Sequence, residues 1–266
     1  MAAEVKLVTV VNPPVKVDPD IKSHMYRTYV SLRRLIAAVT FVLLAILLAY
    51  KAYGDDPVPR TSVSAYYHHD NKGVRMSDVF VAALATIGFL LIAYQGYTDY
   101  ERWVLNVAGG ALLSVVAFPM DWPIDDKTFW PTTFIGWLHV FAAVTFFLSI
   151  AYVCLFRARD TLGETQKGNP IGKTVYTGLY WGIGVLLILT PLLALLFGHF
   201  RASSGTPSGD SSLKSMTAYW VEVSGVFVFL SYWVVKSIEL EWAGQETEQG
   251  VNALAADAVK QEKPPA

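Results

Sequence analysis

The chain is poor in charge and nearly free of cysteine, and these two shortages exclude several classes of protein. Only 16% of its 266 residues are charged and the formal net charge is -1, so nothing indicates a nucleic-acid partner. The single cysteine, Cys154, excludes an intrachain disulfide framework. The first thirty residues contain no apolar stretch of signal-peptide length, so no cleavable signal is expected.

Hydrophobic residues are abundant instead: they make up 53% of the chain, and the mean hydropathy is +0.38. This composition is typical of a membrane protein rather than of a soluble domain. Six apolar segments are about long enough to cross roughly 30 Å of hydrocarbon. They cover residues 34–53, 78–97, 103–120, 131–156, 174–198 and 216–236. The sequence therefore predicts an all-α polytopic membrane protein with a bundle of six transmembrane helices.

The six segments divide the chain into an N-terminal tail (1–30), a transmembrane domain (31–240) and a flexible C-terminal tail (241–266). The C-terminal tail is polar and alanine-rich, which predicts disorder with a short surface helix near 250–260. With the N-terminus inside, the cytoplasmic segments hold fourteen lysines and arginines and the outer segments hold seven. The positive-inside rule then predicts an integral membrane protein with both termini in the cytoplasm.

Two ionisable residues, His139 and Glu222, lie inside predicted spans. An ionisable side chain in hydrocarbon is costly, so it generally has a partner or a function. At 1.5 Å per residue, His139 lies about 12 Å and Glu222 about 9 Å from the outer ends of their helices. Gly136 and Gly225 lie near them and permit close helix approach. We expect His139 and Glu222 to contact each other, either as a structural pin or as the floor of an outward-facing polar cup.

The loop before the second span contains the stretch "TSVSAYYHHD". Its two tyrosines and two histidines are unlike disordered chain, so we expect the loop to be ordered and to cover the cup. Asp78, after this stretch, is expected to cap the N-terminus of the second span. The predicted binding residues of the cup are Tyr66, Tyr67, His139 and Glu222.

The same region offers candidates for catalysis and for metal binding. Ser64 and His68 are four residues apart, a spacing that suits a Ser/His pair but is common by chance. A hydrolase of lipid amides or esters would draw on Ser64, His68, Asp121, His139 and Glu222. The weak metal candidates are His68, His69 and His199, and no HxxxH or HExxH spacing indicates a metal site. No cofactor is predicted.

Four features follow one another along residues 34–240. They are the serine-containing loop "TSVSAYYHHDNKGVRMSDVF", Asn106 with two glycines in the third span, His139 in the fourth, and Glu222 before an aromatic run in the sixth. In this order the chain resembles the DRAM-like (damage-regulated autophagy modulator) six-span membrane proteins. It also resembles uncharacterised bacterial membrane proteins with an SxSxYYY-like loop. A looser resemblance, through Ser64 and His68, is to the seven-span CREST hydrolases, although their paired late histidines are missing here.

The resemblance to the DRAM-like family implies a lipid-linked regulator or scaffold. The favoured function is therefore non-catalytic: a lipid- or partner-binding module, or an accessory subunit of a membrane complex. Its expected partners are membrane lipid and other membrane-protein subunits. The alternative is the intramembrane lipid hydrolase. A small transporter or a proton path through His139 and Glu222 ranks last, because the sequence shows no charged relay at the inner leaflet.

Overall fold

Six α-helices make up most of this computed structural model. It describes residues 19–53, 62–68, 70–71, 74–94, 96–121, 130–162, 171–203 and 217–261. The helices are α1 (Pro19–Tyr53), α2 (Met76–Ala93), α3 (Asp99–Ala117), α4 (Phe134–Tyr152), α5 (Lys173–Ser203) and α6 (Thr217–Gln261). Shorter elements are a 3-10 helix η1 (Ser64–His68), an antiparallel hairpin of β1 (Asp70–Asn71) and β2 (Val74–Arg75), and a π-helical turn η2 (Val153–Arg157). The all-α prediction is confirmed.

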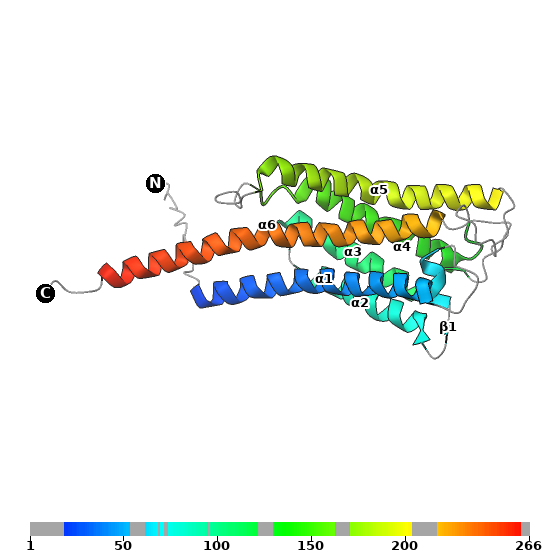
Figure 1. The fold of residues 1–266 in the computed structure, drawn as a ribbon, viewed down its shortest axis with the longest axis horizontal. Helices are drawn as coiled ribbons and strands as arrows, with labels where there is room; N and C mark the ends of the chain where they lie inside the picture. Colours follow the sequence, from blue (N-terminus) through cyan, green and yellow to red (C-terminus); the bar gives the residue numbers. More distant parts are fainter. Residues whose placement is uncertain are drawn as a thin grey trace, which may run out of the picture.

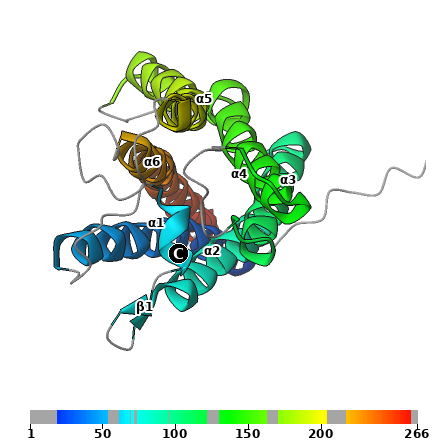
Figure 2. The same ribbon diagram turned by 90° about the vertical axis from the view of Figure 1, so that its right-hand side faces the viewer.

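The helices form a closed ring in which each packs on its neighbours in the chain and α6 packs on α1 (Figure 2). They run side by side along the long axis of the molecule, and α6 extends past the others at one end (Figure 1). The opposite end carries η1 and the hairpin, and we call it the mouth end (Figure 1). We call the other end, where η2 follows α4, the tail end.

Five of the helices are long and apolar enough to cross a membrane. These segments are Arg27–Ala49, Met76–Ala93, Phe134–Arg157, Lys173–Phe197 and Thr217–Glu241. Many large apolar side chains point outward, including Phe41, Phe89 and Phe134, each more than 60% exposed. Such a surface suits lipid rather than water. The fold is thus a helical bundle of the integral membrane class.

Two glycines allow α2 and α3 to pack closely. A Cβ on Gly109 would lie 2.6 Å from the carbonyl oxygen of Gly88 and 2.7 Å from Cγ1 of Ile92. Neither neighbour can move away easily, since one is backbone and the other belongs to the facing helix. Glycine at this crossing therefore fixes the position of α3, whose C-terminal end contributes to the site at the mouth.

Three local predictions differ from the structure. The first helix begins at Pro19, inside the segment assigned to the N-terminal tail, and α6 continues to Gln261 where only a short helix was expected. Asp78 does not cap α2: the N-cap residue is Arg75, and the Asp78 carboxylate pairs with the Arg75 guanidinium at 2.9 Å. The hairpin leads the chain directly into α2, so the helix starts two residues before Asp78. The carboxylate still lies in the first turn, where the helix dipole favours it.

Candidate functional site

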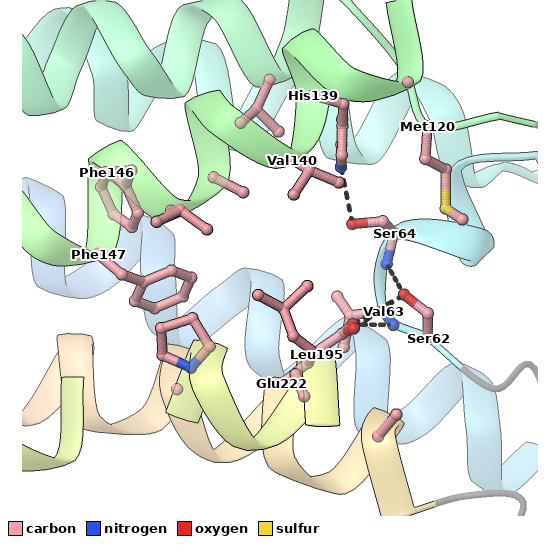
Figure 3. Close-up of a pocket in the computed structure, with 18 of the residues that line it drawn as sticks. Ser62, Val63, Ser64, Met120, His139, Val140, Phe146, Phe147, Leu195 and Glu222 are labelled. Atoms are coloured by element: carbon pink, nitrogen blue, oxygen red, sulfur yellow. Dashed lines mark hydrogen bonds between the residues drawn. The ribbon is translucent and has the colours of Figure 1, made fainter. Parts of the chain in front are cut away.

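The ring encloses a cavity of about 340 Å³ near the mouth end, within the range of small-molecule sites. All six helices and η1 contribute to the wall of this mouth cavity. Apolar side chains form most of the wall, among them Val140, Phe146, Phe147 and Leu195 (Figure 3). The labelled polar side chains, those of Ser62, Ser64, His139 and Glu222, gather at one end of it (Figure 3).

Glu222 projects from α6 and holds the segment that leads into η1. Its carboxylate accepts a hydrogen bond from the Ser62 hydroxyl, at 2.9 and 3.1 Å from its two oxygens, and one from the Val63 N–H at 2.6 Å. Tyr66 on η1 packs on Tyr219, one turn earlier on α6, with ring centroids 5.6 Å apart. Residues 62–68 are therefore an ordered segment that is fixed to α6 and borders the cavity, as expected for this part of the loop.

His139 projects from α4 and is held at both ring nitrogens. Its Nδ1 lies 2.9 Å from the carbonyl oxygen of Phe118, just after α3. A carbonyl oxygen only accepts, so Nδ1 carries the proton and Nε2 of the neutral ring is an acceptor. Ser64 Oγ lies 3.3 Å from Nε2, and the hydroxyl therefore donates to the ring (Figure 3). The hydrogen bond to Phe118 fixes the tautomer of the ring, and the unprotonated Nε2 accepts from Ser64.

The predicted direct contact between His139 and Glu222 is wrong, although both line the mouth cavity. The start of η1 lies between them. Ser64 bonds to His139, the Ser64 N–H donates to Ser62 Oγ at 3.2 Å, and Ser62 donates to Glu222 (Figure 3). Counting residues along each helix placed His139 and Glu222 in the same cavity wall. It could not place the loop segment that lies between them.

Asp121 also lines the cavity, but its carboxylate organises the start of α4. It accepts from the backbone N–H of Thr132 at 2.8 Å and of Thr133 at 3.0 Å, and from the Thr133 hydroxyl. It lies so close to Gly136 that a Cβ there would be 2.5 Å from its oxygen. Burial raises the pKa of the Asp121 carboxyl, but the hydrogen bonds from Thr133 and Thr132 outweigh burial and lower it. Asp121 thus holds Thr133, the N-cap residue of α4, in place.

The remaining candidates on η1 have other roles. Tyr66 is buried between helices and is not part of the cavity wall, whereas Tyr67 lines a side pocket of about 30 Å³. The predicted Ser64/His68 pair is not formed, because His68 Nε2 lies 3.1 Å from the Met120 carbonyl oxygen. A 3-10 helix has three residues per turn, so positions i and i+4 do not face the same side. The histidine that meets Ser64 comes from α4 instead.

The weak metal candidates do not come together in the part of the chain that is described. His69 lies outside the described residues. His199 is exposed near the end of α5, and its ring centroid lies 6.1 Å from that of Trp130. No group of three or more His, Cys, Asp or Glu side chains within the described ranges could hold a metal ion.

At the tail end the structure reveals a buried charged cluster that the sequence analysis missed. Lys236 and Glu239 of α6 are 2% and 0% exposed. The Lys236 ammonium donates to the Ala158 carbonyl at 3.0 Å, Thr161 Oγ1 at 2.7 Å and Glu239 at 3.2 Å. Glu239 also accepts from Thr161 at 2.6 Å and from the Tyr180 hydroxyl. We call this group of Lys236, Glu239, Thr161 and Tyr180 the tail cluster.

No charged relay was found in the sequence at this end, and the burial of charged groups here was not anticipated. Glu101 and Arg33, from α3 and α1, are buried at the same end, with 1% and 3% exposure. The signal in the sequence was the pair Lys236 and Glu239, three residues apart and so on one helix face. It was overlooked because both residues lie at or beyond the predicted end of the last span, where charges ordinarily reach water.

Comparisons with models of protein families, with curated proteins and with solved structures found no match to this chain. The function is therefore inferred from the geometry of the mouth cavity alone.

Proposed function

We propose that this protein is a six-span membrane protein, with both termini cytoplasmic, that binds an amphiphilic lipid in the mouth cavity. The carrying observation is the cavity of about 340 Å³, whose wall is apolar along most of its length and whose side chains of Ser62, Ser64, His139 and Glu222 gather at one end (Figure 3). An acyl chain would lie along the apolar wall, and its polar group would lie near Ser62, Ser64, His139 and Glu222.

The sixth span of this proposal is α3. Its first turns carry Asp99, Glu101 and Arg102, so it has no uninterrupted stretch as apolar as those of the other five helices. It is packed between α2 and α4 in the ring, with Leu105 and Ala108 fully buried. A helix that packs on a neighbour along each side exposes less of its surface to lipid than an isolated one, so it tolerates a few polar residues. The lysine and arginine asymmetry supports the orientation, which would place the mouth cavity in the outer leaflet.

A lipid with hydrogen-bond donors suits the polar end best. The Glu222 carboxylate has more acceptor sites than Ser62 and Val63 use. Hydroxyl, amide or amine groups on a bound lipid would donate to these remaining acceptor sites.

Filling the cavity tests the proposal. Ala143 lines the cavity from α4, whereas Thr145 on the same helix is exposed on the outside. We expect Ala143→Phe to lower the lipid retained per purified protein at least about tenfold, equivalent to roughly 1.4 kcal/mol of binding free energy. The matched variant Thr145→Phe should retain lipid like the wild type. Mass spectrometry of lipid extracted from protein in mild detergent measures both, and equal retention by the two variants would overturn the proposal.

A further inference from the structure

The contact between Ser64 and His139 has a feature that lipid binding alone does not require. The hydroxyl and the imidazole meet at 3.3 Å, and both residues form part of the cavity wall. Neither is enclosed by packing on all sides: Ser64 is half-buried, and His139 retains 8% exposure. A serine whose hydroxyl donates to an acceptor nitrogen of histidine is the arrangement that activates serine as a nucleophile.

The orientation of the imidazole supports the same reading. The Phe118 carbonyl accepts from Nδ1 at 2.9 Å and so keeps Nε2 unprotonated and directed at Ser64. In serine hydrolases a carboxylate ordinarily has this orienting role, and the roles rather than the residue types define the arrangement. The Phe118 carbonyl can stabilise a protonated ring only through its dipole, so we expect transfer from esters rather than from amides.

We propose that the mouth cavity hydrolyses the acyl ester of a bound lipid, with Ser64 as nucleophile and His139 as general base. This inference rests on the proposed lipid binding, because the apolar wall would hold the acyl chain. Glu222 is a positioning residue in this proposal. Through Ser62 and Val63 it holds the segment that carries Ser64 against α6, opposite the helix that carries His139.

The chemistry balances with water as the only co-reactant. Ser64 Oγ attacks the ester carbonyl carbon while its proton passes to Nε2 of His139. The bond from the carbonyl carbon to the alcohol oxygen then breaks, and the alcohol leaves with that proton. Water attacks the acyl-serine, giving its proton to Nε2, and the bond from the acyl carbon to Oγ breaks. Ser64 regains its proton from His139, and the fatty acid is released.

A serine-directed probe with a long alkyl chain tests this inference directly. Wild-type protein in detergent is treated with hexadecyl fluorophosphonate, and the modified peptide is identified by mass spectrometry. We expect one adduct per chain, on Ser64, and none in Ser64→Ala. Ser224→Ala is the matched control, since Ser224 is an exposed serine of α6 that bonds to its own helix at Trp220. It should be labelled like the wild type.

His139→Gln tests the general base, because glutamine keeps a hydrogen-bonding side chain but cannot accept the proton. We expect labelling of Ser64 and release of fatty acid from a monoacyl ester to slow by roughly 10²- to 10⁴-fold, the usual contribution of a general base. Labelling of Ser64 at the wild-type rate in this variant would overturn the role of His139.

Retained lipid, measured on the same samples, separates this inference from the proposed function. Wild-type protein that retains lipid but is not labelled at Ser64 would overturn the hydrolysis and leave lipid binding standing. Protein that retains no lipid and is not labelled would overturn both. Labelling that persists in Ser64→Ala would show that another residue reacts, and would also overturn the inference.

Discussion

Helix α6 places one carboxylate at each end of the bundle, Glu239 fully buried and Glu222 half-buried, and their surroundings differ. Glu239 in the tail cluster is 0% exposed, and Lys236, Thr161 and Tyr180 all bond to it. Glu222, about 25 Å away along the helix at 1.5 Å per residue, faces the mouth cavity with donors on one side only. A buried charge that serves stability is enclosed by protein partners. A carboxylate that faces a cavity is available to a ligand.

The tail cluster has a clear structural task, which is to close the end of α4. After the π-helical turn η2, the chain turns away and leaves carbonyl groups without helical partners. Lys236 donates to one of these, the Ala158 carbonyl, and to Thr161 in the following turn. In this way α6 holds residues 158–161, the turn that follows η2.

The largest predicted effect comes from breaking this cluster. Glu239→Leu leaves the Lys236 ammonium buried with only neutral acceptors, and we expect a loss of about 3–5 kcal/mol of unfolding free energy. At the mouth, Glu222→Gln should cost about 1 kcal/mol or less, because the amide oxygen still accepts from Val63 and the cavity leaves room to adjust. Denaturant unfolding in one detergent measures both. Equal losses would contradict the distinction between the two ends.

The double variant Lys236→Met/Glu239→Leu sharpens the same comparison. It removes both charges and leaves Thr161 and Tyr180 without charged partners. We expect it to be more stable than Glu239→Leu alone, because an unpaired buried ammonium costs more than an apolar replacement of similar size. If the double variant has no higher unfolding free energy than Glu239→Leu, then Lys236 is stabilised chiefly by Ala158 and Thr161 rather than by Glu239.

Much of the fold and part of the site could be read from the sequence. Long apolar segments mark the helices, and an ionisable residue within such a segment marks His139 and Glu222, because neither signal depends on distant residues. The contact between Ser64 and His139 could not be predicted, since it joins residues 75 positions apart and depends on a 3-10 helix that turns His68 elsewhere. The tail cluster was missed for another reason: local charge at the end of a span gives no information on burial, which depends on how the helices pack.

Asp121 provides a pH test at the mouth end. Hydrogen bonding to Thr132 and Thr133 lowers its pKa in the folded protein, below the unfolded value of about 3.9. Its stabilisation is therefore present above that value and is lost as the pH falls through the lower folded pKa. We expect Asp121→Asn to cost about 1–2 kcal/mol at neutral pH, because its hydrogen bonds to Thr132 and Thr133 weaken. As the pH falls below the unfolded value and through the lower folded pKa, the stability gap between wild type and variant should close. A gap that widens with acid would contradict the role of ionised Asp121 at the start of α4.

The variant Ser62→Ala tests how strongly Glu222 holds residues 62–68. Ser62→Ala removes the hydroxyl bonded to Glu222 but leaves the Val63 N–H bond and the packing of Tyr66 on Tyr219. We expect a loss of about 1 kcal/mol, typical of one hydrogen bond with part of its partner still satisfied. Ser231→Ala is the control, because that hydroxyl bonds only to its own helix at Phe227, and its loss should cost less. Protease sensitivity at residues 62–68 should rise in Ser62→Ala alone.

The smallest effect is expected at the ion pair of Arg75 and Asp78, which gives a baseline for charges outside the bundle. The two side chains are 66% and 62% exposed and lie three residues apart at the start of α2. Water and salt screen such a pair, so Arg75→Ala should change the unfolding free energy by no more than about 0.5 kcal/mol, and less at high salt. Asp78→Ala should cost slightly more, because the carboxylate also meets the helix dipole. If either change costs as much unfolding free energy as Glu239→Leu, then burial is not what makes the tail cluster important for stability. The distinction between enclosed and accessible charges would then be refuted.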